Sequence, residues 1–321
     1  MNDLLKVKDL TVSYVTKLQT VTALLNVSLT VKAGEVFGVV GESGCGKSTF
    51  SSVLGRLLGP AGQIETGLVT LGGKDVFALS GKTLRDYRSK DIAYVFQDTM
   101  SVLDPTKTIG NQFRRLFGSG DWRNKAIDAL AHVGLNDHRR VLASYPHQLS
   151  GGMAQRAVIA MALMHKPRLL IADEPTAALD ASVRRDVMDL LVAWCSEIGA
   201  AMIIISHDIP VISRYCNRIG VMYAGRFVEI GPATDFAIAP RHPYAIALLK
   251  SEPGHEGENG VLESLDGAPP LSISRARACA FADRCEHRVN DCVNDIPPLV
   301  ETKNWEVACF QAETLRQEET S

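Results

Sequence analysis

A glycine-rich segment early in the chain carries the residue types that hold the phosphates of a nucleotide. Residues 41–49 read Gly-Glu-Ser-Gly-Cys-Gly-Lys-Ser-Thr and match the pattern G-x-x-x-x-G-K-[S/T]. Glycines let backbone N–H groups converge on phosphate oxygens, and the start of a following helix adds partial positive charge. Lys47 is expected to reach the β- and γ-phosphates, and Ser48 to ligate Mg²⁺. The residues predicted to contact the nucleotide here are Gly41, Ser43, Gly44, Cys45, Gly46, Lys47, Ser48 and Thr49.

This loop has a simpler alternative, a glycine turn that only caps a helix. That alternative leaves the lysine and the hydroxyl at the two chemical positions unexplained. Cys45 most simply fills a variable position of the loop. The other hypothesis for Cys45 is a modifiable thiol, because a helix N-terminus can lower a thiol pKa.

An acidic pair follows an apolar run later in the chain. Residues 169–172 read Leu-Leu-Ile-Ala and are followed by Asp173 and Glu174. A carboxylate at a strand end beside a phosphate loop can hold Mg²⁺ through water, and we assign this role to Asp173. Glu174 is placed to orient or deprotonate an attacking water. Such a pair alone would more often be a solvated loop, but together with Lys47 and Ser48 it favours hydrolysis over simple nucleotide binding.

A second glycine pair precedes another helical run. Ser150, Gly151 and Gly152 stand immediately before the helical pattern of residues 153–165, with no strand pattern ahead of them. This is another anion-binding helix start, and it requires a second phosphate or a second chain. At this motif the sequence resembles the ATP-binding cassette (ABC) ATPases, whose signature is Leu-Ser-Gly-Gly-Gln. Met153 stands in place of the signature glutamine.

The resemblance runs from about residue 4 to residue 231 and implies further site residues. They are Tyr14 (stacking on adenine), Gln97 (linking Mg²⁺ and water to a helical insertion), Asp180 (in the loop 178–180 that crosses the dimer interface) and His207 (contacting the γ-phosphate). Each has an ordinary structural alternative by itself, but their joint order around two phosphate loops disfavours those alternatives. The implied catalytic residues are Glu174, His207, Gln97 and Lys47, with Ser48, Gln97 and Asp173 on Mg²⁺. Two cassettes are then expected to associate head to tail, with each ATP between Lys47 of one and the signature of the other.

The elements that must position these residues follow from the apolar pattern. Alternating runs predict half-buried antiparallel strands, and runs that are apolar on both faces predict buried strands of a parallel sheet. Half-buried strands are expected at residues 4–7, 10–14 and 24–31, and buried strands at 36–40, 168–172 and 201–205. A closing pair of strands is expected at 219–223 and 226–230, and helices are expected at 47–58 and 122–133. The pattern predicts an α/β fold with a helical insertion at about residues 98–165. The resemblance implies that this fold is a P-loop NTPase of the ABC cassette type, with a RecA-like core and an antiparallel β subdomain. The cassette is expected to span residues 1–235, followed by a small C-terminal metal-binding extension at 236–321.

The extension carries four of the seven cysteines, namely Cys279, Cys285, Cys292 and Cys309. Four thiols within 31 residues of a cytosolic chain indicate a metal site. The wide gaps argue mildly against a zinc ribbon, whereas iron–sulfur clusters tolerate varied spacing. The segment His242-Pro243-Tyr244 resembles the start of the extension found in ATPases of dipeptide, oligopeptide and nickel importers. The cysteine spacing resembles that of the dipeptide and oligopeptide transporter ATPases, and this resemblance implies a [4Fe–4S] cluster. Zinc is the second hypothesis and four unliganded cysteines the third.

Composition narrows the classes of function. The chain has 321 residues, 46% hydrophobic and 22% charged, with a net charge of −2. This composition is that of a soluble globular protein and gives no basic surplus for nucleic acid. No apolar run approaches the roughly 18 to 20 residues of a spanning helix, and the N-terminus lacks a secretory signal. We therefore expect a location in the cytosol.

The resemblance also implies the surroundings of the protein. It predicts an ATPase subunit bound peripherally at the cytoplasmic face of the inner membrane, powering import of di- or oligopeptides. The implied partners are a second, paralogous ATPase subunit, two transmembrane permease subunits and an external solute-binding protein, with no nucleic acid. Nickel or opine-like compounds are alternative substrates. The rival functions are a soluble ABC ATPase of DNA repair or translation and a small-molecule P-loop kinase.

Overall fold

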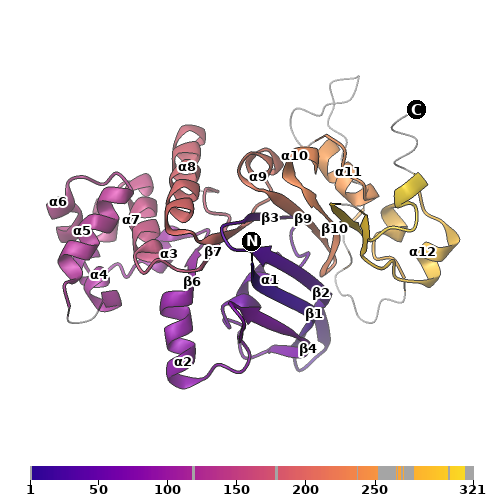
Figure 1. The fold of residues 1–321 in the computed structure, drawn as a ribbon, viewed down its shortest axis with the longest axis horizontal. Coiled ribbons are helices and arrows are strands. Elements are labelled where there is room, and N and C mark those ends of the chain that lie inside the picture. Colours follow the sequence, from indigo (N-terminus) through magenta and orange to yellow (C-terminus); the bar gives the residue numbers. More distant parts are fainter. Residues whose placement is uncertain are drawn as a thin grey trace. The chain divides into compact units, whose positions relative to one another are not determined.

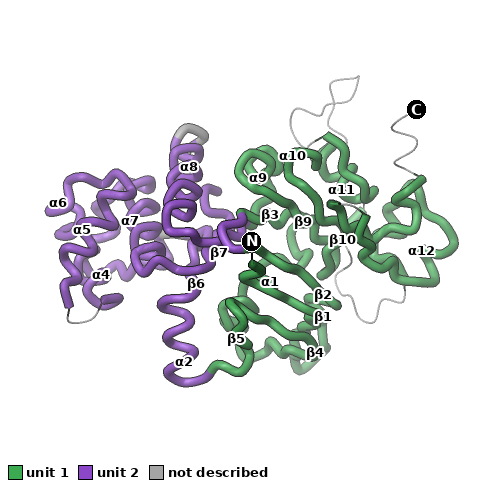
Figure 2. The backbone as a smooth tube through the Cα atoms, viewed as in Figure 1, with its two compact units in different colours: residues 1–32, 36–79, 205–321 green, residues 33–35, 80–204 purple. Residues whose placement is uncertain are grey.

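The computed structural model describes residues 2–314 apart from 118–119, 178–179, 237, 252–264, 266, 269, 271–277 and 303. The chain divides into two compact units (Figure 2). Unit 1 comprises Met1–Lys32, Val36–Leu79 and Ile205–Ser321, and unit 2 comprises Ala33–Glu35 and Ser80–Ile204. Among the described residues, no helix has both the length and the apolar character needed to cross a membrane.

Unit 1 begins with an antiparallel sheet of strand order β2-β1-β4-β5 (Figure 1 and Figure 2). Its strands are β1 (Asp3–Val15), β2 (Thr20–Lys32), β4 (Gly62–Leu71) and β5 (Lys74–Asp75). The two predicted runs at 4–7 and 10–14 are one strand, because β1 continues through an irregularity between Val7 and Leu10 where Asp9 has φ 48°. Alternating apolar side chains of β1 face the core, and Leu5, Leu10 and Val12 are completely buried.

The second group of strands in unit 1 has the order β11-β12-β10-β9-β3. These strands are β3 (Val36–Val40), β9 (Arg218–Tyr223), β10 (Arg226–Pro232), β11 (Val300–Thr302) and β12 (Trp305–Val307). β3 runs parallel to β9, and β9 and β10 form the predicted antiparallel pair. The helices of this unit are α1 (Lys47–Leu54), α9 (Ile209–Tyr215), α10 (Ala233–Phe236), α11 (Pro243–Lys250) and α12 (Asn290–Asn294). Helix α1 ends at Leu54, earlier than residue 58, because Gly55 follows and Arg56 adopts φ 56°.

The C-terminal residues join this sheet. β12 pairs antiparallel with β10, and the ring of Trp305 fills the space that a side chain on Gly231 would need. Glu229 of β10 is completely buried, and its carboxylate accepts hydrogen bonds from the N–H groups of Arg241 (2.9 and 3.0 Å) and His242 (2.6 Å). Burial lowers the pKa of His242 to about 3, so this side chain is neutral at physiological pH. Backbone pairing and buried polar contacts therefore attach the extension to β10.

Unit 2 contains β6 (Ile92–Val95), β7 (Leu169–Asp173) and all but the last residue of β8 (Ala201–Ile205), in the order β8-β7-β6. β6 and β7 are parallel. Between β6 and β7 the described residues form only helices and turns, within the range predicted for a helical insertion. The helices are α2 (Gly81–Asp86), α3 (Thr99–Val102), α4 (Ile109–Phe117), α5 (Trp122–His132), α6 (His138–Ala143), α7 (Gly151–Leu163) and α8 (Ala181–Ile198). β7 and β8 are apolar along almost their whole length because they are buried on both faces.

Candidate nucleotide-binding and hydrolysis site

The glycine-rich loop connects β3 to α1 in unit 1. Gly41 has φ 150° and Gly46 has φ 109°, both in the range that favours glycine. A Cβ on Gly41 would collide with the carbonyl of Met222, and one on Gly46 would lie 2.8 Å from the carbonyl oxygen of Ala23. Both glycines are therefore required by backbone conformation and by close packing.

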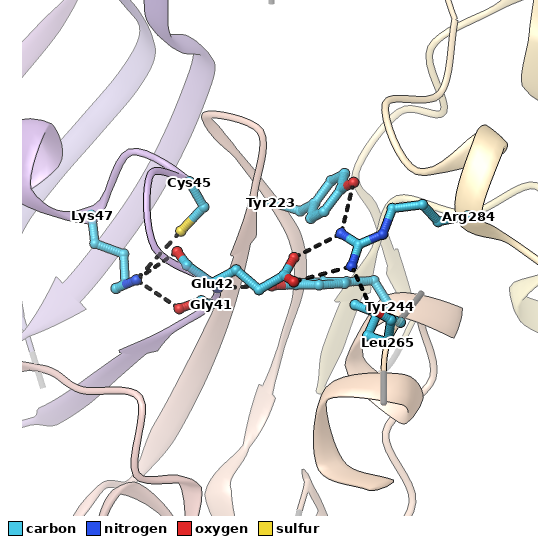
Figure 3. Close-up of polar contacts among 8 residues, drawn as sticks. All are labelled: Gly41, Glu42, Cys45, Lys47, Tyr223, Tyr244, Leu265 and Arg284. Atoms are coloured by element: carbon cyan, nitrogen blue, oxygen red, sulfur yellow. Dashed lines mark hydrogen bonds and ion pairs between the residues drawn. The ribbon is translucent and has the colours of Figure 1, made fainter. Parts of the chain in front are cut away.

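Lys47 lies across this loop. Its Nζ donates to the carbonyl oxygens of Gly41 (2.6 Å) and Glu42 (2.9 Å) and approaches Cys45 Sγ at 3.6 Å (Figure 3). Helix α1 starts without a side-chain cap, and Ser48 in its first turn is exposed. A lysine ammonium, an uncapped helix start and an exposed hydroxyl are the groups that a phosphate and its Mg²⁺ require. The loop therefore fits the predicted nucleotide.

Tyr14 of β1 and Cys45 of the loop are two further residues predicted to contact the nucleotide. The Tyr14 hydroxyl lies 3.4 Å from Thr49 Oγ1, which joins the predicted adenine contact to the end of the loop. Cys45 is only 2% exposed, and burial raises the pKa of its thiol despite the opposing effect of Lys47. Burial and a raised pKa both disfavour the hypothesis of an activated thiol at Cys45. Ser43 and Gly44 are exposed.

His207 belongs to unit 1 and is exposed in the turn between β8 and α9. The Asp208 carboxylate caps α9 by accepting from Val211 N–H at 3.0 Å, and Ser206 Oγ accepts from Asp208 N–H at 3.0 Å. The N–H of Ser206 donates to the carbonyl of Val39 at 3.2 Å. The turn that carries His207 is thus fixed to the last residues of β3, immediately before the glycine-rich loop.

The acidic pair lies at the end of β7 in unit 2. Glu174 has φ 48°, an uncommon conformation for a residue with a side chain. β6 and β7 are parallel with Val95 opposite Ala172, so Gln97 and Glu174 each lie two residues beyond this pair, at the same edge of the sheet. Gln97 is exposed, whereas Asp173 and Glu174 are half-buried. Within unit 2 the structure therefore brings the predicted Gln97, Asp173 and Glu174 to one sheet edge.

The Ser-Gly-Gly motif forms the start of α7. Ser150 is its N-cap, and its Oγ accepts from Met153 N–H at 3.3 Å. Gly151 is exposed and Gly152 half-buried, so both lie near the surface. Asp180 is the exposed N-cap of α8, and its neighbours Ala178 and Leu179 lie outside the described residues.

One contact in unit 2 was missed from the sequence. Gln155 of α7 is buried, and its Nε2 donates to the carbonyl of Pro175 at 2.6 Å. Pro175 directly follows Glu174, so the helix that begins at the Ser-Gly-Gly motif holds the segment after the acidic pair. The helical pattern of residues 153–165 includes Gln155, but no sequence pattern indicates its partner.

Comparisons with known proteins agree with these features. A family model described as "ABC transporter" matches residues 24–177, and one described as "Oligopeptide/dipeptide transporter, C-terminal region" matches residues 228–292. The dipeptide transport ATP-binding protein DppD of Bacillus subtilis is 40% identical over 299 residues, covering 91% of this chain and 89% of DppD. The chain belongs to the oligopeptide/dipeptide family of ABC transporter ATPases.

Other relatives extend this result. The oligopeptide transport ATP-binding protein OppD of Salmonella typhimurium is 39% identical over 304 residues, covering 93% of this ABC ATPase and 90% of OppD. The dimeric ATP-binding cassette MJ0796, solved with ADP and phosphate, superposes with a TM-score of 0.64 at 30% identity, over 72% of this chain and 99% of that one. The predicted ABC cassette fold is confirmed, and as a member of this family the protein binds and hydrolyses ATP.

The four cysteines of the extension, unlike the cassette fold, do not match their prediction in this structure. Cys279 N–H donates to the carbonyl of Cys292 at 2.9 Å, and burial raises the pKa of Cys279 and Cys285, and that of Cys309 to about 11. Within the described part of the chain, which includes all four cysteines, no three His, Cys, Asp or Glu side chains form a group that could hold a metal ion. The four described cysteines therefore do not form the predicted metal site in this structure.

Proposed function

We propose that this ABC ATPase powers the import of di- or oligopeptides. The observation that carries the proposal is the joint presence of a nucleotide-binding loop and the oligopeptide/dipeptide-type C-terminal region at residues 228–292. The relatives DppD and OppD are named for dipeptide and oligopeptide transport. Residues 1–235 form the cassette in this proposal, and residues 236–321 form the extension.

The proposed catalytic roles follow from the chemistry of the side chains. Lys47 binds the β- and γ-phosphates, and Ser48, Gln97 and Asp173 hold Mg²⁺ directly or through water. Glu174 accepts a proton from the attacking water. His207 contacts the γ-phosphate. ATP supplies the phosphoanhydride bond whose hydrolysis drives the cycle.

The signature of one cassette is proposed to act on the nucleotide of another. Ser150, Gly151 and Gly152 would meet the γ-phosphate held by the corresponding lysine of a second ATPase subunit, and Asp180 would line the interface. Hydrolysis then removes the charge that bridges the two subunits, so closure and opening become a mechanical step. The second ATPase is a paralogous chain in this proposal.

The remaining partners define the location. Two membrane-spanning permease subunits hold the ATPase at the cytoplasmic face of the inner membrane, and an external solute-binding protein delivers the peptide. Membrane attachment is peripheral in this arrangement, through protein contacts alone.

Transport by the complete assembly tests the proposal. Membrane vesicles containing the ATPase pair and the permeases, supplied with the solute-binding protein, are expected to accumulate labelled peptides only with internal MgATP. Accumulation of nickel or opine-like compounds instead would contradict the peptide assignment. Co-purification with nucleic acid and no permease would favour a soluble ABC ATPase, and a phosphorylated small-molecule product would favour a kinase.

We also propose that Cys279, Cys285, Cys292 and Cys309 bind a [4Fe–4S] cluster. The proposal rests on the spacing of these four cysteines, which resembles that of the dipeptide and oligopeptide importer ATPases. Burial raises the pKa of the thiols of Cys279, Cys285 and Cys309, and the charge of Cys292 adds to each shift. Burial disfavours their thiolate forms, and a cationic metal centre would offset that penalty. A cluster would clamp the short extension.

Metal analysis of the full chain purified without oxygen tests this second proposal. About four iron and four sulfide per chain are expected, with a large loss of both in Cys309→Ser. Cys195→Ser provides the matched control, because Cys195 is buried in α8 and outside the extension. Stoichiometric zinc, or no metal at all, would contradict the cluster.

A further inference from the structure

A salt bridge joins the C-terminal extension to the glycine-rich loop. Arg284 Nη1 lies 2.8 Å from Glu42 Oε2, and Arg284 Nη2 lies 3.1 Å from Glu42 Oε1 (Figure 3). The Arg284 side chain is 6% exposed and that of Glu42 is 25% exposed. Two parallel N–H···O bonds in a mostly buried setting make a strong and directional pair. The second residue of the glycine-rich loop is therefore bound by a residue 242 positions further along the chain.

Arg284 is itself held in place by the extension and by β9. Its guanidinium also donates to the Tyr223 hydroxyl and to the carbonyl of Leu265, each at 3.3 Å. The neighbouring Phe281 is buried and packs edge-on against the rings of Tyr223 (5.3 Å) and Tyr244 (5.5 Å). The guanidinium is thus fixed before any nucleotide arrives.

Glu42 connects this group to the phosphate-binding lysine. Its N–H donates to the Tyr244 hydroxyl at 2.9 Å, and its carbonyl accepts from Lys47 Nζ at 2.9 Å. Figure 3 shows Glu42 between the two cations, with its carbonyl toward Lys47 and its carboxylate toward Arg284. Arg284 therefore keeps a negative charge on the side of the loop away from Lys47.

We propose that Arg284 is a positioning residue of the ATP site, which holds the Glu42 carboxylate away from the phosphates and ties nucleotide affinity to the C-terminal extension. This inference rests on the proposed role of the loop in binding ATP. Without Arg284, the Glu42 carboxylate would either form an ion pair with the Lys47 ammonium or repel the triphosphate. Both events weaken ATP binding.

Calorimetric titration of the full-length chain with the Mg²⁺ complex of AMP-PNP, a non-hydrolysable ATP analogue, tests the proposal. Arg284→Met is expected to raise Kd about tenfold, which corresponds to about 1.4 kcal/mol. Glu42→Gln is expected to change Kd less than about threefold, because it removes the repelling charge. The double variant Glu42→Gln, Arg284→Met should return to the Kd of Glu42→Gln. Arg288→Met is the matched control, since Arg288 pairs with Asp283 on the same segment but is 48% exposed, and it should bind as the wild type does.

The rescue in the double variant separates positioning from a purely structural role. If Arg284 only folded the extension, the double variant would bind as weakly as Arg284→Met, and the proposal would be overturned. Should Arg284→Met fail to fold, Arg284→Lys keeps the charge but loses the paired bonds, and a Kd equal to wild type would overturn the proposal. Normal binding by Arg284→Met with lost binding by Lys47→Ala would overturn this inference alone. No binding by the wild type would overturn the ATP site as well.

Discussion

The Glu174→Gln variant is expected to bind ATP but to hydrolyse it at least about 100-fold more slowly than the wild type. An amide has nearly the shape of the carboxylate but cannot accept a proton from the attacking water. The side chain lies directly after β7, at the sheet edge that also carries Gln97. Its φ of 48° shows that the backbone is held in an uncommon conformation at this position.

Phosphate release by the reconstituted transporter measures this loss. Glu197→Gln is a suitable control, because Glu197 belongs to α8 of the same unit and its side chain is 64% exposed. Its Oε1 lies 3.5 Å from Nε2 of His132, whose side chain is 43% exposed. Near-normal hydrolysis by Glu174→Gln would remove Glu174 from the role of base.

The same variant tests the proposed dimer. With hydrolysis blocked, ATP should hold the two cassettes together. An equimolar mixture of the variant and its paralogous ATPase should therefore elute as a dimer with MgATP and as separate subunits without it. A sample whose elution ignores MgATP would contradict the proposed bridging of Lys47 and the signature across two subunits.

The buried strands were predictable because burial on both faces leaves a strong sequence pattern. The predicted residues 36–40 and 201–205 coincide with β3 and β8. β4 was missed because its first seven residues are mostly exposed and include Gly67, so the apolar pattern is weak. β11 and β12 have three residues each, too few to show a period of two.

In the candidate site, residues within short motifs were predictable from the sequence, whereas contacts between distant segments were not. Lys47, Asp173, Glu174 and the Ser-Gly-Gly motif were found because each belongs to a short segment whose spacing reflects its chemistry. The ion pair of Glu42 and Arg284 could not be predicted in this way. Glu42 occupies a variable position of the glycine-rich loop, and no sequence pattern connects it with Arg284. The surroundings of the buried Cys45 likewise include a distant residue, because its carbonyl accepts a hydrogen bond from Gly225 N–H at 2.8 Å, which the loop sequence does not reveal.

Lys47→Ala is expected to lower ATPase activity by at least about 100-fold, through loss of ATP affinity as well as of turnover. The ammonium is the cation that lies over the glycine-rich loop, with bonds of 2.6 and 2.9 Å to the carbonyls of Gly41 and Glu42. When nucleotide binds, the Lys47 ammonium must exchange these carbonyl partners for phosphate oxygens, which carry negative charge and are stronger hydrogen-bond acceptors. Its removal therefore costs both phosphate binding and the organisation of the loop.

A comparison with Lys47→Arg separates these two contributions. Arginine keeps the charge but replaces a compact ammonium by a larger planar group, so it should retain part of the nucleotide affinity and little turnover. Lys6→Ala is the control, because Lys6 lies on β1 of the same unit and forms an exposed pair with Asp3. Equal losses in Lys47→Ala and Lys47→Arg would show that the shape of the ammonium within the loop matters more than its charge. Normal activity in Lys47→Ala would exclude the loop as the site of ATP hydrolysis, because the variant lacks the ammonium proposed to bind the β- and γ-phosphates.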